Sequence, residues 1–143
     1  MTDAKKLEIF QKRCIRYVLQ DFNSTYQIML NVLKVPTLYE RRLRNVLECV
    51  FKVLHNQVPP VENIFTLLDR HYDFRNTDML HIPHCQTVKF GTKSVRVNGA
   101  CLWNKLPNYI RSQQTFMDFK KLLNVHEFSC TCNNCPQCSI SSL

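Results

Sequence analysis

The chain has 143 residues, of which 45% are hydrophobic, and it carries a formal net charge of +8. This length suits one domain with a modest core, and no apolar run approaches the ~18 residues that would raise the prospect of a membrane-spanning helix. The basic balance favours polyanionic partners, and a membrane partner is not expected. The positive charge is unevenly distributed along the chain, since residues 85–121 hold seven Lys and Arg against one carboxylate. A merely solvated face remains the alternative interpretation of each basic cluster.

The segment from Asp3 to Gln20 has the period of an amphipathic helix. Its apolar residues fall on one face, which we expect to be the core face, and its cations fall opposite. The basic face is either a solvated surface or a rail along a nucleic-acid backbone. The expected core face consists of Leu7, Phe10, Cys14, Tyr17 and Val18, and the basic face of Lys5, Lys12, Arg13 and Arg16.

Two further helices are expected before Pro59-Pro60. Ser24 can cap a short helix that runs to Leu33, and Thr37 can cap a long helix that reaches about His55. Residues 61–68 are compatible with one or two more helical turns. The long helix has an apolar stripe of Tyr39, Leu43, Val46, Leu47, Val50 and Leu54, and its outward cations are Arg41, Arg44 and Lys52.

A β-hairpin is the main expectation for the next region. Residues 69–84 have no clear period, and we interpret them as a loop ending in a short strand at Leu80–Pro83. Residues 86–90 and 94–97 alternate in polarity around a turn at 91–93, which predicts a hairpin. Its core side would consist of Val88, Phe90, Val95 and Val97, and its outer side or tip would carry Lys89, Lys93 and Arg96.

Two short helices are expected at about residues 99–105 and 115–124. The later one has a stripe of Phe116, Phe119, Leu122 and Leu123. Trp103, the only tryptophan, shares its pattern with Leu102 and Leu106, which favours a core role over base stacking. The predicted fold is mainly α with one small antiparallel β-hairpin, an α+β arrangement. We divide it into a helical unit (1–58), a connecting segment (59–84), a hairpin with C-terminal helices (85–125) and a Cys-rich tail (126–143).

The tail has the pattern C-x-C-x2-C-x2-C. Four thiolates could complete a tetrahedral zinc site, although nine residues around one ion would be cramped. Redox-labile thiols, or a half-site completed by a partner chain or a distant histidine, are the alternatives. His126 lies close enough in sequence to be a fifth candidate ligand. The candidate ligands are Cys130, Cys132, Cys135 and Cys138. Because the other four cysteines lie in apolar patterns, we expect a reduced, intracellular protein of the nucleus or cytoplasm.

No catalytic residue stands out. No Ser–His–Asp set can be assigned from spacing, and glycines at positions 91 and 99 alone cannot form a P-loop or a dinucleotide-binding loop.

Several short sequence motifs of the chain resemble those of one known family and occur in the same order. The most specific is Leu102-Trp103-Asn104 with Leu106-Pro107, followed by Ile110-Arg111 and Phe119-Lys120. Gln11 to Arg16 and Pro36 to Leu43 match earlier blocks of the same pattern. The chain resembles the C-terminal, post-palm region of the reverse transcriptase polyprotein of LINE-type (non-LTR) retrotransposons, the jockey-like elements especially.

The resemblance implies a helical, thumb-like bundle with a Cys-rich tail from an RNA-directed DNA polymerase. The metal-binding palm aspartates of that family are absent, since the chain contains no Asp-Asp or Asp-x-Asp, so we expect no polymerase activity from it alone. The implied partners are RNA or DNA, bound through the phosphate backbone, and the palm and fingers of the parent polymerase. The alternatives are a degenerate or captured retroelement fragment that acts as a structural or protein-interaction module, and a small zinc or thiol protein.

Face geometry, rather than the family, nominates the nucleic-acid contacts. The candidates are Lys12, Arg13, Arg16, Arg41, Arg44, Lys89, Lys93, Arg96, Lys120 and Lys121.

Overall fold

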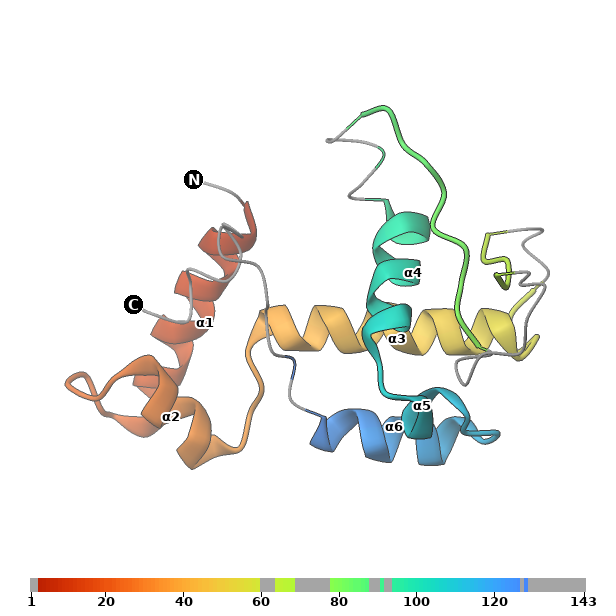
Figure 1. The fold of residues 1–143 in the computed structure, drawn as a ribbon. Coiled ribbons are helices and arrows are strands. Elements are labelled where there is room, and N and C mark those ends of the chain that lie inside the picture. The colour runs from red at the N-terminus through yellow and green to blue at the C-terminus, as the bar shows by residue number, and fades with distance from the viewer. Residues whose placement is uncertain are drawn as a thin grey trace. The chain divides into compact units, whose positions relative to one another are not determined.

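The computed structural model describes residues 3–59, 64–68, 78–87, 91, 94–126 and 128. Their regular structure is helical, as Figure 1 shows. None of the described helices is both long enough and apolar enough to cross a membrane. The helices are α1 (Asp3–Leu19), α2 (Tyr26–Leu33), α3 (Leu38–Leu54), α4 (Val95–Lys105), α5 (Asn108–Arg111) and α6 (Phe116–Val125).

The chain divides into two compact units, and each has its own core. The described part of unit 1 consists mainly of residues 3–42, and unit 2 comprises Leu43–His126. The helix α3 begins in unit 1 and continues through unit 2. The four-part division expected from the sequence stays a prediction.

Unit 1 packs α2 against one side of α1. The buried cluster joins Ile15 of α1 to Tyr26, Met29 and Leu30, and half-buried Leu19 and Leu33 extend it. The helix α2 begins after Thr25, whose side chain makes no capping bond, so the predicted Ser24 cap is wrong. The backbone N–H of Ser24 instead donates to Asp21 Oδ1, which forms a tight turn between the helices.

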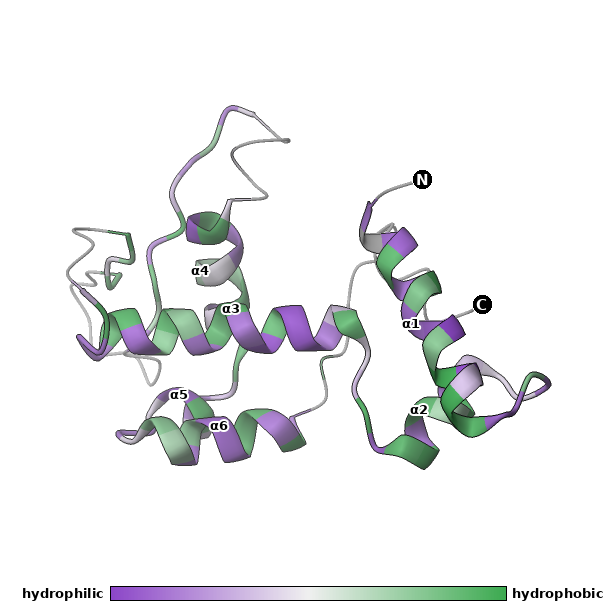
Figure 2. Ribbon diagram, turned by 180° about the vertical axis from the view of Figure 1, so that it is seen from behind, coloured by the Kyte–Doolittle hydropathy of each residue, from purple (hydrophilic) through white to green (hydrophobic). Residues whose placement is uncertain are grey.

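The expected core face of α1 is also wrong. Phe10, Tyr17 and Val18 are 65%, 67% and 71% exposed, whereas Glu8 and Ile15 are buried. The helix carries apolar residues on its exposed side as well as its buried side. Figure 2 shows apolar and polar residues interspersed along α1. Hydrogen bonds from other elements to Glu8 select which of the two sides faces inward.

The start of α3 confirms the predicted Thr37 cap. Thr37 Oγ1 accepts from the Glu40 backbone N–H at 3.1 Å, and the Glu40 carboxylate accepts from the Thr37 N–H at 3.2 Å. This reciprocal capping box satisfies two of the N–H groups that the first turn of a helix leaves without partners.

Unit 2 is built around the apolar stripe of α3. Phe51 stacks on Phe119 of α6 with ring centroids 4.4 Å apart, and Phe119 lies 5.8 Å from the Trp103 ring of α4. The helix α4 crosses α3, and α6 lies alongside it (Figure 1). The fully buried side chains here include Leu47, Val50, Phe51, Leu80, Trp103, Ile110, Phe119 and Leu123.

The second strand of the predicted hairpin is wrong, because residues 95–97 form the first turn of α4. Ser94 caps this helix, and its hydroxyl accepts from the Val97 N–H at 3.4 Å. The two valines that suggested alternation lie on different helix faces, since Val97 is 7% exposed and Val95 is 54% exposed. Residues 88–90, 92 and 93 lie outside the described residues, as do the predicted positions of Lys89 and Lys93.

The strand expected at Leu80–Pro83 is reduced to one antiparallel bridge between Leu80 and Leu67. Two backbone hydrogen bonds flank it, Leu68 N–H to Met79 O and His81 N–H to Thr66 O, each 2.8 Å long. Of residues 61–68, those described (64–68) form this bridge and its bends rather than a helical turn.

Candidate nucleic-acid interface

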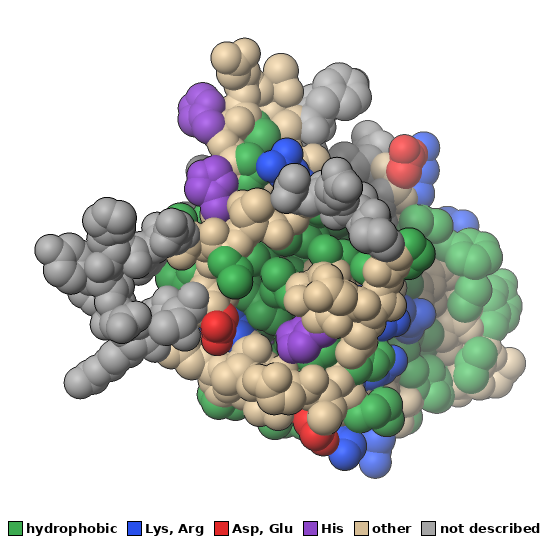
Figure 3. Space-filling model, turned by 90° about the vertical axis from the view of Figure 1, so that its right-hand side faces the viewer, with side chains coloured by type: hydrophobic (Ala, Val, Ile, Leu, Met, Phe, Trp, Pro, Cys, Tyr) green, Lys and Arg blue, Asp and Glu red, His purple; other side chains and the backbone are tan. Residues whose placement is uncertain are grey.

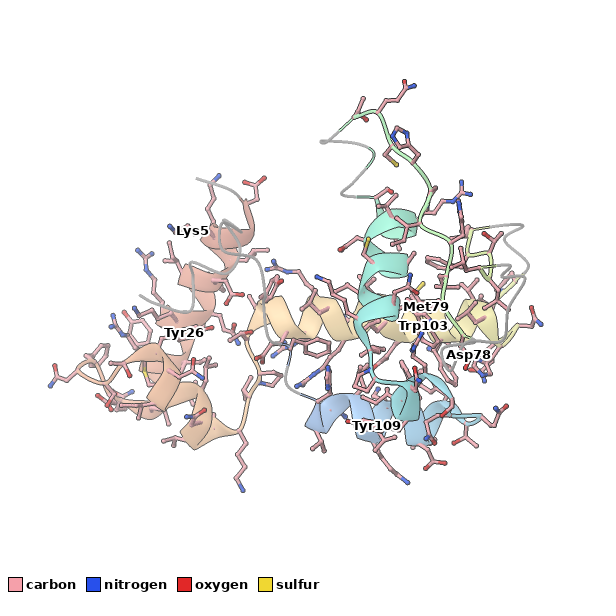
Figure 4. The ribbon with its side chains drawn as sticks, viewed as in Figure 1. Lys5, Tyr26, Asp78, Met79, Trp103 and Tyr109 are labelled. Atoms are coloured by element: carbon pink, nitrogen blue, oxygen red, sulfur yellow. The ribbon has the colours of Figure 1, made fainter. Side chains whose placement is uncertain are left out.

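A buried carboxylate organises unit 1. Glu8 Oε2 accepts from the Tyr26 hydroxyl at 3.1 Å, and Glu8 Oε1 accepts from the Tyr39 backbone N–H at 2.9 Å. Burial, and then the nearby Glu8 carboxylate, raise the pKa of Tyr26 above its usual range, so the phenol stays a donor. Glu8 therefore ties α1 to α2 and to the first turn of α3, at the position labelled Tyr26 in Figure 4.

This arrangement places four of the nominated cations in unit 1. On α1, Arg13 is exposed, while Lys12 and Arg16 are half-buried beside the inward face, and Arg41 is exposed near the start of α3. The guanidinium of Arg16 contributes to lowering the pKa of Asp21, after the larger effect of the hydrogen bonds from Ser24 and Asn23. Within the part of the chain that the structure describes, Lys12, Arg13 and Arg41 form no ion pair.

Three of the nominated cations of unit 2 that the structure describes, Arg44, Lys120 and Lys121, make contacts with other residues of the chain. Lys120 pairs with Glu48 at 3.6 Å and lies over the Phe116 ring, and Lys121 pairs with Asp118 at 3.3 Å. Arg44 donates to the Asn124 carbonyl at 3.3 Å, which holds the end of α6 to α3. On the face drawn in Figure 3, Lys and Arg are scattered rather than gathered into one patch.

Arg96 is exposed in the first turn of α4. Its position differs from the outer hairpin side that the sequence suggested. Because the N-terminal turn of a helix carries a partial positive charge, Arg96 adds to a local positive potential there.

The cysteines that the structure describes do not form a metal site. Cys14 and Cys49 are exposed, Cys85 and Cys101 are half-buried, and all four are free thiols. Among the described residues, no group of three or more His, Cys, Asp or Glu side chains could hold a metal ion. Cys130, Cys132, Cys135 and Cys138 lie outside the described residues, so a zinc site in the tail stays a prediction.

The most specific sequence block has a structural role that the sequence did not reveal. Trp103 is buried, and its indole Nε1 donates to the Asp78 carbonyl at 2.9 Å (Figure 4). Asn104 Oδ1 accepts from the Leu80 N–H, and Asn104 Nδ2 donates to the Leu80 carbonyl, both at 2.8 Å. Arg111, also buried, donates to Asp78 O at 3.3 Å and to the Asn108 side chain.

These bonds fix the extended segment 78–80 against α4 and α5. The segment uses one edge to pair with residues 66–68 and the other edge to bind Asn104. A buried tryptophan confirms the core role that its pattern favoured. Burial lowers the pKa of Arg111, an effect that the charge of Asp78 opposes, and its position marks it as structural rather than as a phosphate ligand.

Comparison with known proteins adds no relative: no family model, curated protein or solved structure matches this chain.

Proposed function

We propose that this chain is a non-catalytic nucleic-acid-binding module, of the kind that follows the palm in a LINE-type reverse transcriptase. The observation that carries the proposal is the set of exposed cations in unit 1 that form no ion pair among the described residues. Arg13 and Arg41 are the best placed of them, because both are exposed and both lie on elements fixed by Glu8. The sequence resemblance and the net charge of +8 support the same function.

The chemistry is neutralisation of phosphates. Each Lys or Arg that contacts a phosphate releases condensed counterions, so the affinity falls as the salt concentration rises. A cation already paired with a carboxylate contributes less to the binding free energy. Either the ion pair must be broken before the cation can contact a phosphate, or its charge is already offset by the carboxylate. We therefore expect unit 1 to supply more of the binding than Lys120 and Lys121.

A salt titration of matched variants tests this. Fluorescence anisotropy would measure binding of the full chain to a labelled RNA at salt concentrations between ~50 and ~200 mM. The Arg13→Gln/Arg41→Gln variant should reduce the slope of log affinity against log salt by about 0.7–0.9 for each lost contact. The Lys120→Gln/Lys121→Gln variant removes the same charge from residues paired with Glu48 and Asp118, and it should change the slope less.

Either of two results would overturn the proposal. A flat salt dependence of the unmodified chain would mean that its cations are only solvated. Equal loss in the two double variants would mean that net charge alone, rather than the cations of unit 1, determines binding.

A further inference from the structure

The exposed side of α1 carries an alternation of cations and aromatic rings. Lys6, Phe10, Arg13 and Tyr17 are separated by four, three and four residues, which places all four on one helical face. The expectation that Arg13 lies opposite the aromatic residues is therefore wrong. Phe10 is 65% exposed and Tyr17 is 67% exposed. Lys6 pairs with the exposed Asp3 at 3.1 Å, a surface pair of the same kind as Lys121–Asp118, so Arg13 is the unpaired cation of this face among the described residues.

A third ring extends this stripe past the end of α1. Phe22 is 53% exposed and meets Tyr17 edge to face, with the ring centroids 5.8 Å apart and the planes at 88°. The Phe22 ring contacts one side of Tyr17, and most of Tyr17 stays accessible. The stripe of Lys6, Phe10, Arg13, Tyr17 and Phe22 is called the α1 stripe below.

Exposed rings interleaved with cations are suited to a ligand that has flat apolar faces and regular negative charge. Single-stranded nucleic acid has both, because its unpaired bases offer their faces for stacking and its phosphates lie nearby. Phe10 and Tyr17 are seven residues apart, so they lie about 10 Å apart along the helix axis. The two rings would therefore contact different nucleotides of one strand.

The same stripe is poorly suited to the main competing occupants. In a duplex the base faces are stacked on one another and unavailable to protein rings. A second copy of the chain, packed on this stripe by twofold symmetry, would place the Lys6 and Arg13 of both copies in one interface, where only the exposed Asp3 of each copy lies beside these cations. Charge complementarity thus favours a polyanion over self-association.

We propose that the α1 stripe is a stacking platform for single-stranded RNA or DNA, with Phe10 and Tyr17 contacting bases and Lys6 and Arg13 contacting phosphates. This inference rests on the proposed function and adds the class of nucleic acid to it. It also gives a role to aromatic residues that the helical period assigned to the core.

The test compares a labelled oligothymidine with a duplex of equal length, using the full chain and anisotropy. The Phe10→Leu/Tyr17→Leu variant keeps apolar bulk but removes both ring faces. It should weaken single-strand binding by tenfold or more, since stacking contributes roughly 1–3 kcal/mol per base. The salt slope and the duplex affinity should be unchanged, because no phosphate contact is removed. The Lys6→Gln/Arg13→Gln variant should instead reduce the salt slope.

Two controls isolate stacking. Tyr17→Phe keeps the ring and should bind as the unmodified chain does, and Ile28→Ala removes an exposed apolar side chain of α2 and should have no effect. Circular dichroism should give unchanged melting for every variant, because the replaced side chains are exposed.

The outcomes separate this inference from the proposed function. Salt-steep binding that is the same in Phe10→Leu/Tyr17→Leu would overturn the stacking platform and leave the proposed function intact. Absence of binding to both probes would overturn both. Sedimentation of the unmodified chain as a dimer that the same variant converts to a monomer would assign the stripe to self-association instead.

Discussion

At the residue scale, the chain uses side-chain hydrogen bonds to fix segments that have little regular structure. Asn104 is the clearest example. Its side-chain amide bonds both the N–H and the carbonyl of Leu80, the two groups that a neighbouring strand would bond in a sheet. A primary amide offers one acceptor and a donor group, which matches the carbonyl and N–H of a single extended residue. The most specific block of the sequence is therefore explained by what it holds in place.

Replacing this amide tests the interpretation. Asn104→Ala should lower the free energy of unfolding by about 2–6 kcal/mol, because the N–H and the carbonyl of buried Leu80 lose their partners at roughly 1–3 kcal/mol each. Urea denaturation would measure the change. Asn98→Ala, an exposed position in the same helix, is the matched control and should change the stability by less than about 0.5 kcal/mol. Similar losses in the two variants would contradict the interpretation.

At the element scale, the helical period of the sequence located most helices but not the faces that they bury. The bounds expected for α1, α3 and α6 agree closely with the observed ones, since caps and period are local properties. The buried side of α1 depends on a bond between Glu8 and Tyr39, which are 31 residues apart. No local pattern contains that information, so the helical period alone places Phe10 and Tyr17 in the core.

The predicted second strand of the hairpin is a helix for a different physical reason. Alternating valines fit either a strand or the first turn of a helix when the run is only four residues long. The Ser94 cap and the buried positions Val97, Ala100 and Trp103 favour the helix. Local sequence is also insufficient for the candidate cations. The helical period predicts their faces, but it does not predict the carboxylates that pair with Lys120 and Lys121.

The N-terminus of α6 gives a prediction about pH. Hydrogen bonding from Thr115, and then from Lys121, lowers the pKa of Asp118 below its ordinary value. A carboxyl whose folded pKa is lowered stabilises the fold above its unfolded pKa and loses that contribution as pH falls through the folded pKa. Thr115→Val should therefore raise the pKa of Asp118 toward its ordinary value.

Carboxyl carbon shifts in an NMR titration between about pH 2 and 6 would follow this change. Asp21 is an internal reference, since its lowered pKa comes from Ser24 and Asn23 and should be the same in both proteins. An Asp118 titration that is identical with and without Thr115 would show that this hydroxyl does not stabilise the carboxylate.

At the scale of the whole molecule, the distribution of charge decides what kind of recognition is available. Unit 1 carries eight Lys and Arg against four carboxylates in residues 3–42, and one of those carboxylates, Glu8, is buried and hydrogen-bonded. In unit 2, Lys120 and Lys121 are paired and Arg111 is buried. A surface of this kind attracts phosphates.

Binding should therefore be nearly independent of nucleotide sequence. Phosphate contacts carry no sequence information, and stacking tolerates any base because every base has an apolar face. Unlabelled single strands of equal length but different sequence, used as competitors at ~150 mM salt, should displace a labelled strand with affinities that agree within about fivefold, a spread that differences in stacking strength can produce. The comparison needs strands without stable secondary structure, because pairing would hide the base faces. A preference of more than a hundredfold for one sequence would exceed what phosphates and stacking supply, and would require base-edge contacts from side chains that this interpretation does not use.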